Sequence, residues 1–287
     1  MYAVITGAAS GIGREIARQI AQRGLALVVT DRDEDRLATL VDELERACGN
    51  RSPILDATPL DISDHDAVHD WAEQIIASHG APAHVYHAAG IAIWGDVRRM
   101  PEEKWQKVID VNLLGTVNMV RAWTPAMANA GALAPGRRGK KRTFMAISSA
   151  AAIIGLPWHA AYSASKAGVL GMCEVLRFDL APHGVSVHVA VPGAVDTPLV
   201  RTVDIDGVDR SQPRVARLTK LFQRHAITPE KAAQKIIRGV DRDKFLIPTS
   251  ADVPLARVAK VLAPWAYRGV MRGLNRGFRW AAAKQHR

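Results

Sequence analysis

Cysteine is scarce in this sequence, since only Cys48 and Cys173 occur among 287 residues. Two thiols so far apart form no disulfide framework, which favours a reduced compartment. Long apolar runs are also absent, because none reaches the roughly 18 to 20 residues that span a bilayer. The N-terminal segment shows neither the charged region nor the cleavage site of a secretory signal. We therefore expect a soluble, cytoplasmic protein that touches a membrane at most peripherally.

Acidic residues are missing from residues 253–287, although this stretch contains eight Lys or Arg. Apolar and aromatic side chains lie between the cations, which predicts a main domain, 1–250, followed by a basic amphipathic extension, 251–287. Pro254 and Pro264 are expected to interrupt any single long helix there. Two explanations stay open: the apolar face packs on a partner subunit, or residues 253–287 lie peripherally in a membrane interface.

The formal net charge is +10, and a second group of cations lies between Gly136 and Arg142. Basic clusters can attract nucleic acid or anionic lipid, yet a solvated basic loop is the commoner explanation. No nucleic-acid recognition motif accompanies the charge. We therefore expect no nucleic-acid partner.

Apolar, strand-like runs alternate with helical patterns along the chain, which is typical of βαβ units around a parallel sheet. The predicted strands are 2–6, 25–30, 54–60, 83–88, 143–148 and 185–191, with a weaker seventh at 245–247. The predicted helices are 12–23, 33–47, 64–78, 101–130, 160–181 and 229–240. The sequence thus predicts one doubly wound α/β domain with a mainly seven-stranded parallel sheet.

The stretch TGAASGIG, from Thr6 to Gly13, joins the first predicted strand to the first predicted helix. In a doubly wound fold, a dinucleotide pyrophosphate rests at this turn, on the helix N-terminus. The glycine spacing is GxxxGxG rather than GxGxxG. The three glycines can still supply a tight turn, backbone approach to the phosphates and close packing of helix and strand.

Asp31 ends the second predicted strand, about 20 residues after the glycines. A carboxylate at this position can accept hydrogen bonds from the adenosine ribose hydroxyls and would repel a 2′-phosphate. The neighbouring Arg32 argues the other way, because a guanidinium can accommodate that phosphate. We expect NAD in preference to NADP.

Tyr162 and Lys166 are four residues apart in the stretch AYSASK, so a helix presents both on one face. A phenol titrates near pH 10. A neighbouring ammonium, together with a positive nicotinamide ring, is expected to lower the pKa of Tyr162 toward neutrality. Tyr162 could then give a proton to a carbonyl or remove one from an alcohol.

These motifs together resemble the short-chain dehydrogenase/reductase family over residues 2–248. TGAASGIG resembles the family's cofactor loop, and the segment 60–62 (LDI) resembles the one whose aspartate contacts adenine. The segment 111–113 (VNL) resembles the one with a helix-kinking asparagine, and 192–197 (PGAVDT) the one that closes over the nicotinamide. The resemblance implies a Rossmann-type domain, and by itself it also implies a homodimer or homotetramer.

The same resemblance implies a catalytic tetrad of Asn112, Ser149, Tyr162 and Lys166. Ser149 is selected because the family's catalytic serine lies thirteen residues before its tyrosine. In this scheme Ser149 binds the substrate oxygen and Tyr162 moves the proton. Lys166 lowers the phenol pKa and holds the nicotinamide ribose, and Asn112 holds a water that connects Lys166 to solvent. The implied cofactor-binding residues are Gly7, Ser10, Gly11, Ile12, Gly13, Asp31, Arg32, Asp61, Ile62, Ala89, Gly90, Tyr162, Lys166, Pro192, Gly193, Val195 and Thr197.

The sequence departs from the family after its fourth strand, where NNAG is replaced by HAAG at residues 87–90. Ala89 and Gly90 still allow close approach to the adenine ribose, and His87 could fill in for an asparagine through its ring nitrogens. His65 and His69 lie four residues apart on a predicted helix, but no third convincing metal ligand accompanies them. A solvated helix surface is the commoner explanation, and we expect no metal.

Large apolar residues occupy segments that flank the substrate site in the family, namely Trp94, Leu156, Trp158 and Leu199. They predict a hydrophobic alcohol or ketone of the retinoid, steroid or acyl type. Residues 199–227 are expected to form a mobile lid over the substrate. Its apolar residues, which agree with an apolar pocket, are Val200, Val203, Ile205, Leu218, Leu221 and Phe222. The several arginines of this segment could equally receive an acidic group of a substrate.

We therefore expect an NAD(P)-dependent oxidoreductase that transfers a hydride between the cofactor and a secondary alcohol or ketone. The alternative is a catalytically silent NAD(P)-binding sensor or scaffold. The serine, tyrosine and lysine of the tetrad disfavour that alternative.

Overall fold

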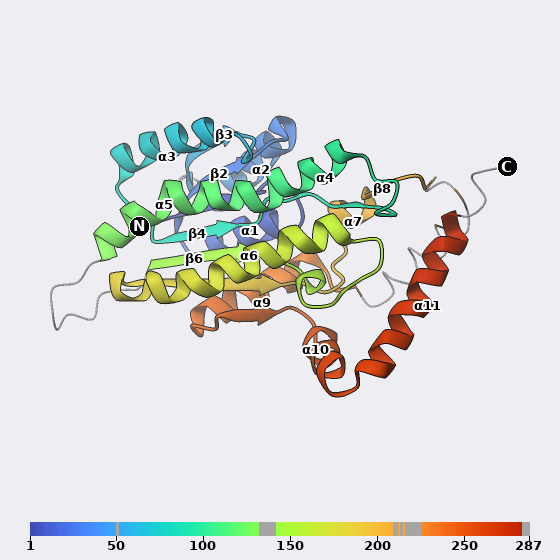
Figure 1. The fold of residues 1–287 in the computed structure, drawn as a ribbon. Coiled ribbons are helices and arrows are strands. Elements are labelled where there is room, and N and C mark those ends of the chain that lie inside the picture. Colours follow the sequence, from blue (N-terminus) through green and yellow to red (C-terminus); the bar gives the residue numbers. More distant parts are fainter. Residues whose placement is uncertain (50–51, 132–141, 209–211, 213–214, 216–225, 283–287) are drawn as a thin grey trace.

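The structure is a computed structural model that describes residues 1–49, 52–131, 142–208, 212, 215 and 226–282. Its centre is a parallel sheet of seven strands in the order β3-β2-β1-β4-β6-β7-β9 (Figure 1). This architecture confirms the predicted doubly wound α/β fold, including the weak seventh strand. The strands are β1 (Tyr2–Thr6), β2 (Ala26–Asp31), β3 (Ile54–Pro59), β4 (His84–His87), β6 (Arg142–Ile147), β7 (Val185–Val191) and β9 (Leu246–Pro248).

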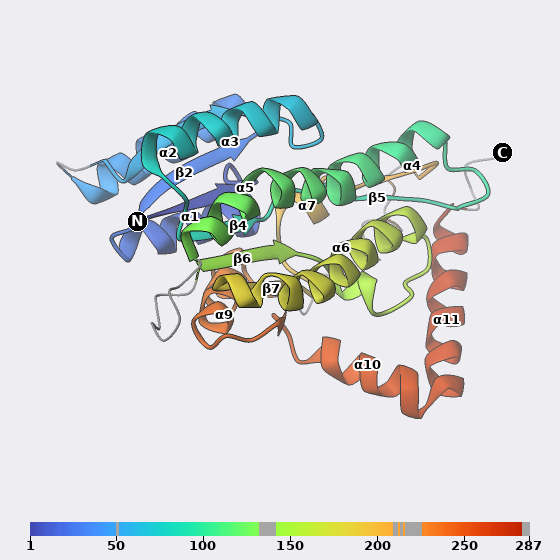
Figure 2. The same cartoon turned by 60° about the vertical axis from the view of Figure 1, so that its left-hand side comes forward.

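Helices cover both faces of the sheet, which explains why the central strand β1 is buried along its whole length (Figure 2). On one face, α1 (Gly11–Gln22), α2 (Glu34–Cys48) and α9 (Pro229–Asp241) share a buried core with the strands. On the other, α3 (His65–His79), α5 (Gly115–Gly131) and α6 (Ala160–Asp179) pack around the fully buried Trp123.

The predicted helix 101–130 is divided in the structure, which corrects that prediction. It consists of α4 (Glu102–Ile109), a π-helical turn η1 (Asp110–Leu114) and α5. The side-chain periodicity of one π turn differs too little from an α-helix for the sequence pattern to reveal it. The turn matters because it carries Asn112 with a fully buried side chain.

Short elements connect the main ones at the carboxyl edge of the sheet. They are η2 (Ala150–Ala152), α7 (Pro198–Arg201) and a two-stranded sheet of β5 (Ile93–Trp94) and β8 (Asp204–Ile205), whereas η3 (Ala181–His183) lies at the amino edge, just before β7. Lys104 on α4 anchors this small sheet, because its Nζ lies 2.8 Å from carboxylate oxygens of both Asp204 and Asp206. Of the predicted lid residues, Val203 and Ile205 are buried, whereas Leu218, Leu221 and Phe222 lie outside the described residues.

The C-terminal residues form two helices, α10 (Asp252–Leu262) and α11 (Pro264–Ala282), at one end of the molecule (Figures 1 and 2). The chain breaks between them where Pro264 begins α11, as expected, whereas Pro254 lies in the first turn of α10 and does not interrupt it. Hydrogen bonds fix them to the segment after η2, from Lys260 Nζ to Ile153 O (2.8 Å) and from Gly155 N to Tyr267 Oη (2.7 Å). Within the described part of the chain, no helix has the length and apolar character needed to cross a membrane. The predicted basic loop, apart from Arg142, lies outside the described residues.

Candidate active site

A cavity of about 260 Å³ opens at the carboxyl ends of β1 and β4, where the winding direction of the sheet reverses. Ligands of doubly wound folds bind at this position. Every residue that we predicted to contact the cofactor lines this cavity, and so does Ser149. Sequence reasoning missed several lining residues that adjoin the predicted ones along the chain, namely Leu60, Ala88, Ile91, Val111, Ile147 and Ser148, whereas Val200 of the predicted lid also lines the cavity.

The glycine loop forms the floor of the cavity by close backbone packing. Gly7 has φ +65°, and a Cβ there would lie 2.7 Å from the amide nitrogen of Ala89. A Cβ at Gly13, in the first turn of α1, would collide with the carbonyl oxygen of Gly7. The first turn of α1 contains no acidic residue, so its free amides and helix dipole are available to an anion. This cradle fits the pyrophosphate of a dinucleotide.

Asp31 lies at the edge of the same cavity, with both carboxylate oxygens held by backbone amides. Oδ2 accepts from Ala9 N at 3.0 Å, and Oδ1 accepts from Asp33 N at 3.1 Å. The exposed guanidinium of Arg32 lies 4.0 Å from Asp61. Burial acts to raise the pKa of Asp61, but hydrogen bonds from Ser63 and the charge of Arg32 outweigh it and hold that pKa below its usual range.

Ser149, Tyr162 and Lys166 line one wall of the cavity. Lys166 is buried on α6 and donates from Nζ to Ile147 O at 2.9 Å, and this burial lowers its pKa to about 8. Burial raises the pKa of Tyr162, although a hydrogen bond with Ser149 acts in the opposite direction. The pKa of Tyr162 is thus raised in the protein chain, whereas the sequence led us to expect a lowered pKa. The reason is that burial outweighs the hydrogen bond with Ser149.

Asn112 lies behind this wall, where its side chain joins two distant segments. Its Oδ1 accepts from Ile91 N at 2.8 Å, and its Nδ2 donates to Ile91 O at 3.0 Å and to Ser165 Oγ at 3.1 Å. Asn112 therefore ties the loop after β4 to the helix that carries Tyr162 and Lys166. It is not among the residues that line the cavity.

The residues predicted to contact substrate are divided between two places. Leu199 lines the cavity, whereas Leu156 packs against the hydrophobic core. The Trp94 and His159 rings are tilted against each other with centroids 4.2 Å apart, and the His159 ring lies 6.4 Å from that of Tyr162. Leu156, Trp94 and Trp158 are not among the residues that line this cavity, and their contact with substrate stays a prediction.

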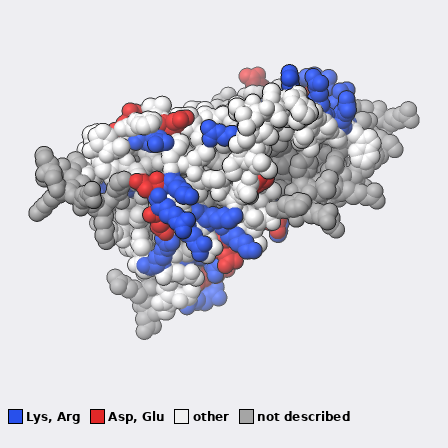
Figure 3. All heavy atoms as spheres, turned by 90° about the horizontal axis from the view of Figure 1, so that it is seen from below, with Lys and Arg blue, Asp and Glu red and all other residues white. Residues whose placement is uncertain are grey.

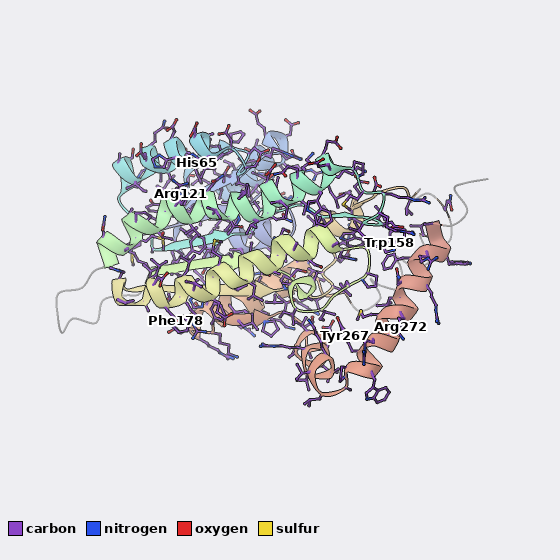
Figure 4. The ribbon with its side chains drawn as sticks, in the orientation of Figure 1. His65, Arg121, Trp158, Phe178, Tyr267 and Arg272 are labelled. Carbon is purple, nitrogen blue, oxygen red and sulfur yellow. The ribbon has the colours of Figure 1, made fainter. Side chains whose placement is uncertain are left out.

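Trp158 extends the aromatic cluster to the C-terminal helix, as Figure 4 shows. Its ring stacks on Phe278 of α11 with centroids 5.6 Å apart, and Phe278 also lies 6.3 Å from His159. Trp158 has φ 69°, a conformation that is uncommon outside glycine. Neither His159 nor Phe278 was predicted, because no local sequence signal connects α11 with the active-site helix.

His65 and His69 lie in the first two turns of α3, and neither lines the cavity (Figure 4 labels His65). Both are exposed, and each pairs with an acidic neighbour, Asp66 at 2.8 Å and Glu73 at 3.6 Å. His69, Asp70 and Glu73 come close enough to share an ion, but exposed acidic groups on a helix commonly gather without one.

Comparison with known proteins identifies this arrangement. The model of the short chain dehydrogenase family matches residues 1–206. The chain belongs to the short-chain dehydrogenase/reductase family. It therefore belongs to an oxidoreductase family whose members use a nicotinamide cofactor.

Two bacterial relatives show how far the similarity extends. The oxidoreductase EphD of Mycobacterium tuberculosis is 32% identical over 93% of this chain, which spans only 44% of EphD. The 3-oxoacyl acyl-carrier-protein reductase FabG of Thermotoga maritima is 30% identical, and the match covers 82% of this chain and 87% of the FabG chain.

Among solved structures, a short-chain dehydrogenase/reductase from Burkholderia phymatum in complex with NAD is 26% identical, with a TM-score of 0.77. The match covers 90% of this chain and 92% of that one. An alcohol dehydrogenase from Thermococcus sibiricus, complexed with 5-hydroxy-NADP, is 22% identical with a TM-score of 0.70 over 86% of this chain and 94% of that one. The second likeness concerns the fold alone.

Proposed function

We propose that this short-chain dehydrogenase/reductase transfers a hydride between NAD(H) and a hydrophobic secondary alcohol or ketone, with Tyr162 as the general acid and base. The observation that carries the proposal is the placement of Ser149, Tyr162 and Lys166 on one wall of the cavity whose floor is the glycine loop. A catalytically silent sensor would not need a serine hydroxyl, a phenol and a buried ammonium around one space.

The chain's own residues would bind and orient both reactants. The amides at the start of α1 would hold the cofactor's pyrophosphate, and Asp31 its adenosine ribose. The bound cofactor supplies or accepts the hydride. Ser149 would hydrogen-bond the substrate oxygen, while Tyr162 donates a proton to a ketone or removes one from an alcohol.

Lys166 would act on the phenol through its charge. Its pKa of about 8 leaves the ammonium largely protonated at pH 7. A positive charge close to Tyr162 favours the phenolate and so opposes the raised pKa that burial imposes. The Ser149 hydrogen bond acts in the same direction.

A preference for NAD over NADP is supported by the way Asp31 is held. Two backbone amides fix its carboxylate, so it cannot easily turn away from a 2′-phosphate. Arg32 faces Asp61 at 4.0 Å, which reduces its availability to that phosphate.

The hydrophobic character of the substrate is supported by the aromatic residues beside Tyr162. The rings of Trp94, His159, Trp158 and Phe278 form a continuous cluster of tilted, stacked and edge-on contacts. Burial lowers the pKa of His159 to about 4, so this ring is neutral and the cluster uncharged near pH 7. FabG, by its name, acts on a 3-oxoacyl group. We propose the retinoid, steroid or acyl class on these grounds.

The first test is to titrate the wild type and Asp31→Ala with NADH and with NADPH. Nicotinamide fluorescence reports the binding. Tighter binding of NADH, weakened by Asp31→Ala, is the expected result. Stronger binding of NADPH to the wild type would overturn the NAD preference. A protein that binds cofactor but converts no member of a broad panel of secondary alcohols and ketones would be the sensor instead.

The expected homodimer or homotetramer also stays a proposal. It is supported by Val175 and Phe178 on α6, whose side chains are large, apolar and exposed (Figure 4). Light scattering after size-exclusion chromatography measures the assembly directly.

A further inference from the structure

The outer side of α10 carries an apolar row that the rest of the described chain does not cover. Its residues are between 51% and 77% exposed, although each is large and apolar. The row follows α10 and continues across the break onto the first turn of α11. It consists of Leu255, Val258, Val261, Leu262 and Trp265.

A basic row of four exposed arginines follows the outer side of α11, namely Arg268, Arg272, Arg276 and Arg279. Spacings of four, four and three residues place them on one side of the helix. The opposite side faces the body of the protein, through Tyr267 and Phe278 (Figure 4). In Figure 3 a group of Lys and Arg stands at the upper right, at the end of the molecule where α11 lies in Figure 1.

We propose that α10 and α11 together dock this protein on the surface of a bilayer that contains anionic lipid. The apolar row would enter the boundary between headgroups and acyl chains, as amphipathic interfacial helices do. Trp265 suits that boundary because its ring combines an apolar body with a polar N–H. The basic row would lie against the lipid phosphates.

The charge of the two helices favours an anionic surface over a second copy of this chain. No acidic residue follows Asp252 in the sequence, so the whole of α11 and nearly all of α10 carry positive charge only. A two-fold symmetric contact brings the same patch of both copies together. Such a contact on this face would place arginines against arginines without a compensating carboxylate.

The apolar row favours a bilayer over nucleic acid. A phosphate backbone could neutralise the four arginines, but it would leave Leu255, Val261 and Leu262 exposed to water. A bilayer interface accommodates both rows at once, since its headgroups are anionic and its interior is apolar.

The test is sedimentation of the full chain with vesicles of phosphatidylcholine, with or without phosphatidylserine. The wild type should bind the phosphatidylserine vesicles much more tightly, and added salt should weaken that binding. Arg272→Gln/Arg276→Gln/Arg279→Gln should weaken it about a hundredfold, from the usual contribution of three cations near an anionic surface. Leu262→Ser/Trp265→Ser should weaken it as well.

The matched control removes three exposed cations outside the extension, as Arg121→Gln/Lys231→Gln/Arg242→Gln. The affinity of this variant for the vesicles should stay within about twofold of that of the wild type. The reason is that its three substituted cations lie on α5, on α9 and at the end of α9, outside α10 and α11. Circular dichroism establishes that each variant is folded, and the comparison of the two vesicle types needs only the wild type.

Three results would overturn the proposal. One is a wild type that fails to bind phosphatidylserine vesicles at low salt, and another is equal weakening by the control. The third is a contact with a different macromolecule on this face. If the protein binds no vesicles and its dimer is lost in Leu262→Ser/Trp265→Ser, the face belongs to a second copy. If it binds no vesicles and its binding to duplex DNA is lost in the triple arginine variant, the face belongs to nucleic acid.

Discussion

The Nδ1 atom of His87 lies 2.8 Å from the hydroxyl of Thr6, which joins the end of β4 to the end of β1 directly below the candidate cofactor loop. On its other side, His87 Nε2 lies 3.0 Å from Thr116 Oγ1, which donates its own proton to Asn112 O at 2.6 Å. Thr116 must therefore accept from Nε2–H, and Nδ1 accepts from Thr6. The neutral ring links Thr6, at the start of the glycine loop, to Thr116 in the first turn of α5, a role that suits the position where the family usually has asparagine.

Replacing His87 should change how stability depends on pH. Burial, aided by the charge of Lys166, lowers the pKa of His87 to about 3, whereas an unfolded histidine titrates near 6.5. Between these values the unfolded chain binds the extra proton, so stability falls as the pH falls. Because of His87, the free energy of unfolding of the wild type should fall by about 2 kcal/mol between pH 7 and pH 5.

Urea unfolding of the wild type and His87→Asn at pH 7 and pH 5 measures this contribution. His87→Asn should lose less stability on acidification, even if the variant is less stable at pH 7. The exposed His183→Asn is the control and should follow the wild type. Equal losses for all three proteins would contradict the assignment.

Gly7→Ala should weaken cofactor binding and destabilise the fold, because the new Cβ meets the Ala89 amide at 2.7 Å and the residue has φ +65°. Gly24→Ala is a matched control for the backbone strain alone, since Gly24 has φ +78° and nothing within 4 Å of an added Cβ. We expect both variants to lose about 1 kcal/mol or more of stability. Gly7→Ala alone should also lose NADH affinity by tenfold or more, and equal NADH affinity in the two variants would contradict the close packing.

Tyr162→Phe should reduce kcat by about a hundredfold to ten-thousandfold, the usual contribution of general acid–base catalysis. The affinity for NADH should change little, because the ring still fills its place in the cavity wall. Tyr2→Phe removes a phenol that donates to Gly80 O at 2.7 Å, far from the glycine loop in the fold, and should keep full activity. Retained turnover in Tyr162→Phe would mean that another group moves the proton.

Phe278→Ala should raise KM for a bulky apolar alcohol more than for a small one. The ring stacks on Trp158 and borders His159, next to Tyr162, so its loss opens that side of the aromatic cluster. Removing one aromatic contact of this kind corresponds to about twofold to tenfold. Val270→Ala changes an exposed side chain of the same helix and should leave both KM values unaltered. A uniform rise for both alcohols would indicate a general loosening of α11 instead.

The main motifs of the fold and of the cofactor site could be predicted because they are local. Strands buried on both faces need continuous apolar runs, and the turn after β1 needs glycine where a side chain would collide with Ala89 or with Gly7 itself. Tyr162 and Lys166 are four residues apart, and residues with this spacing lie on one face of any helix. These features depend on neighbours in the chain, so the sequence displays them.

The roles of Asn112 and His87 depend on contacts between segments far apart in the chain. The Asn112 side chain bonds to Ile91 and to Ser165, and His87 to Thr6 and Thr116. Only packing shows that each joins two elements, because a single amide or imidazole in a sequence does not indicate its partners.

The sequence by itself determined a doubly wound sheet, a glycine loop that can hold a pyrophosphate, and a basic C-terminal extension. The tertiary structure decided that Trp94 and Trp158 lie beside the cavity rather than in it, and that Phe278 of the extension joins them. It also decided which sides of α10 and α11 face outward. The reason is physical: periodicity specifies the faces of one element, whereas the direction in which each face points is set by what packs against it.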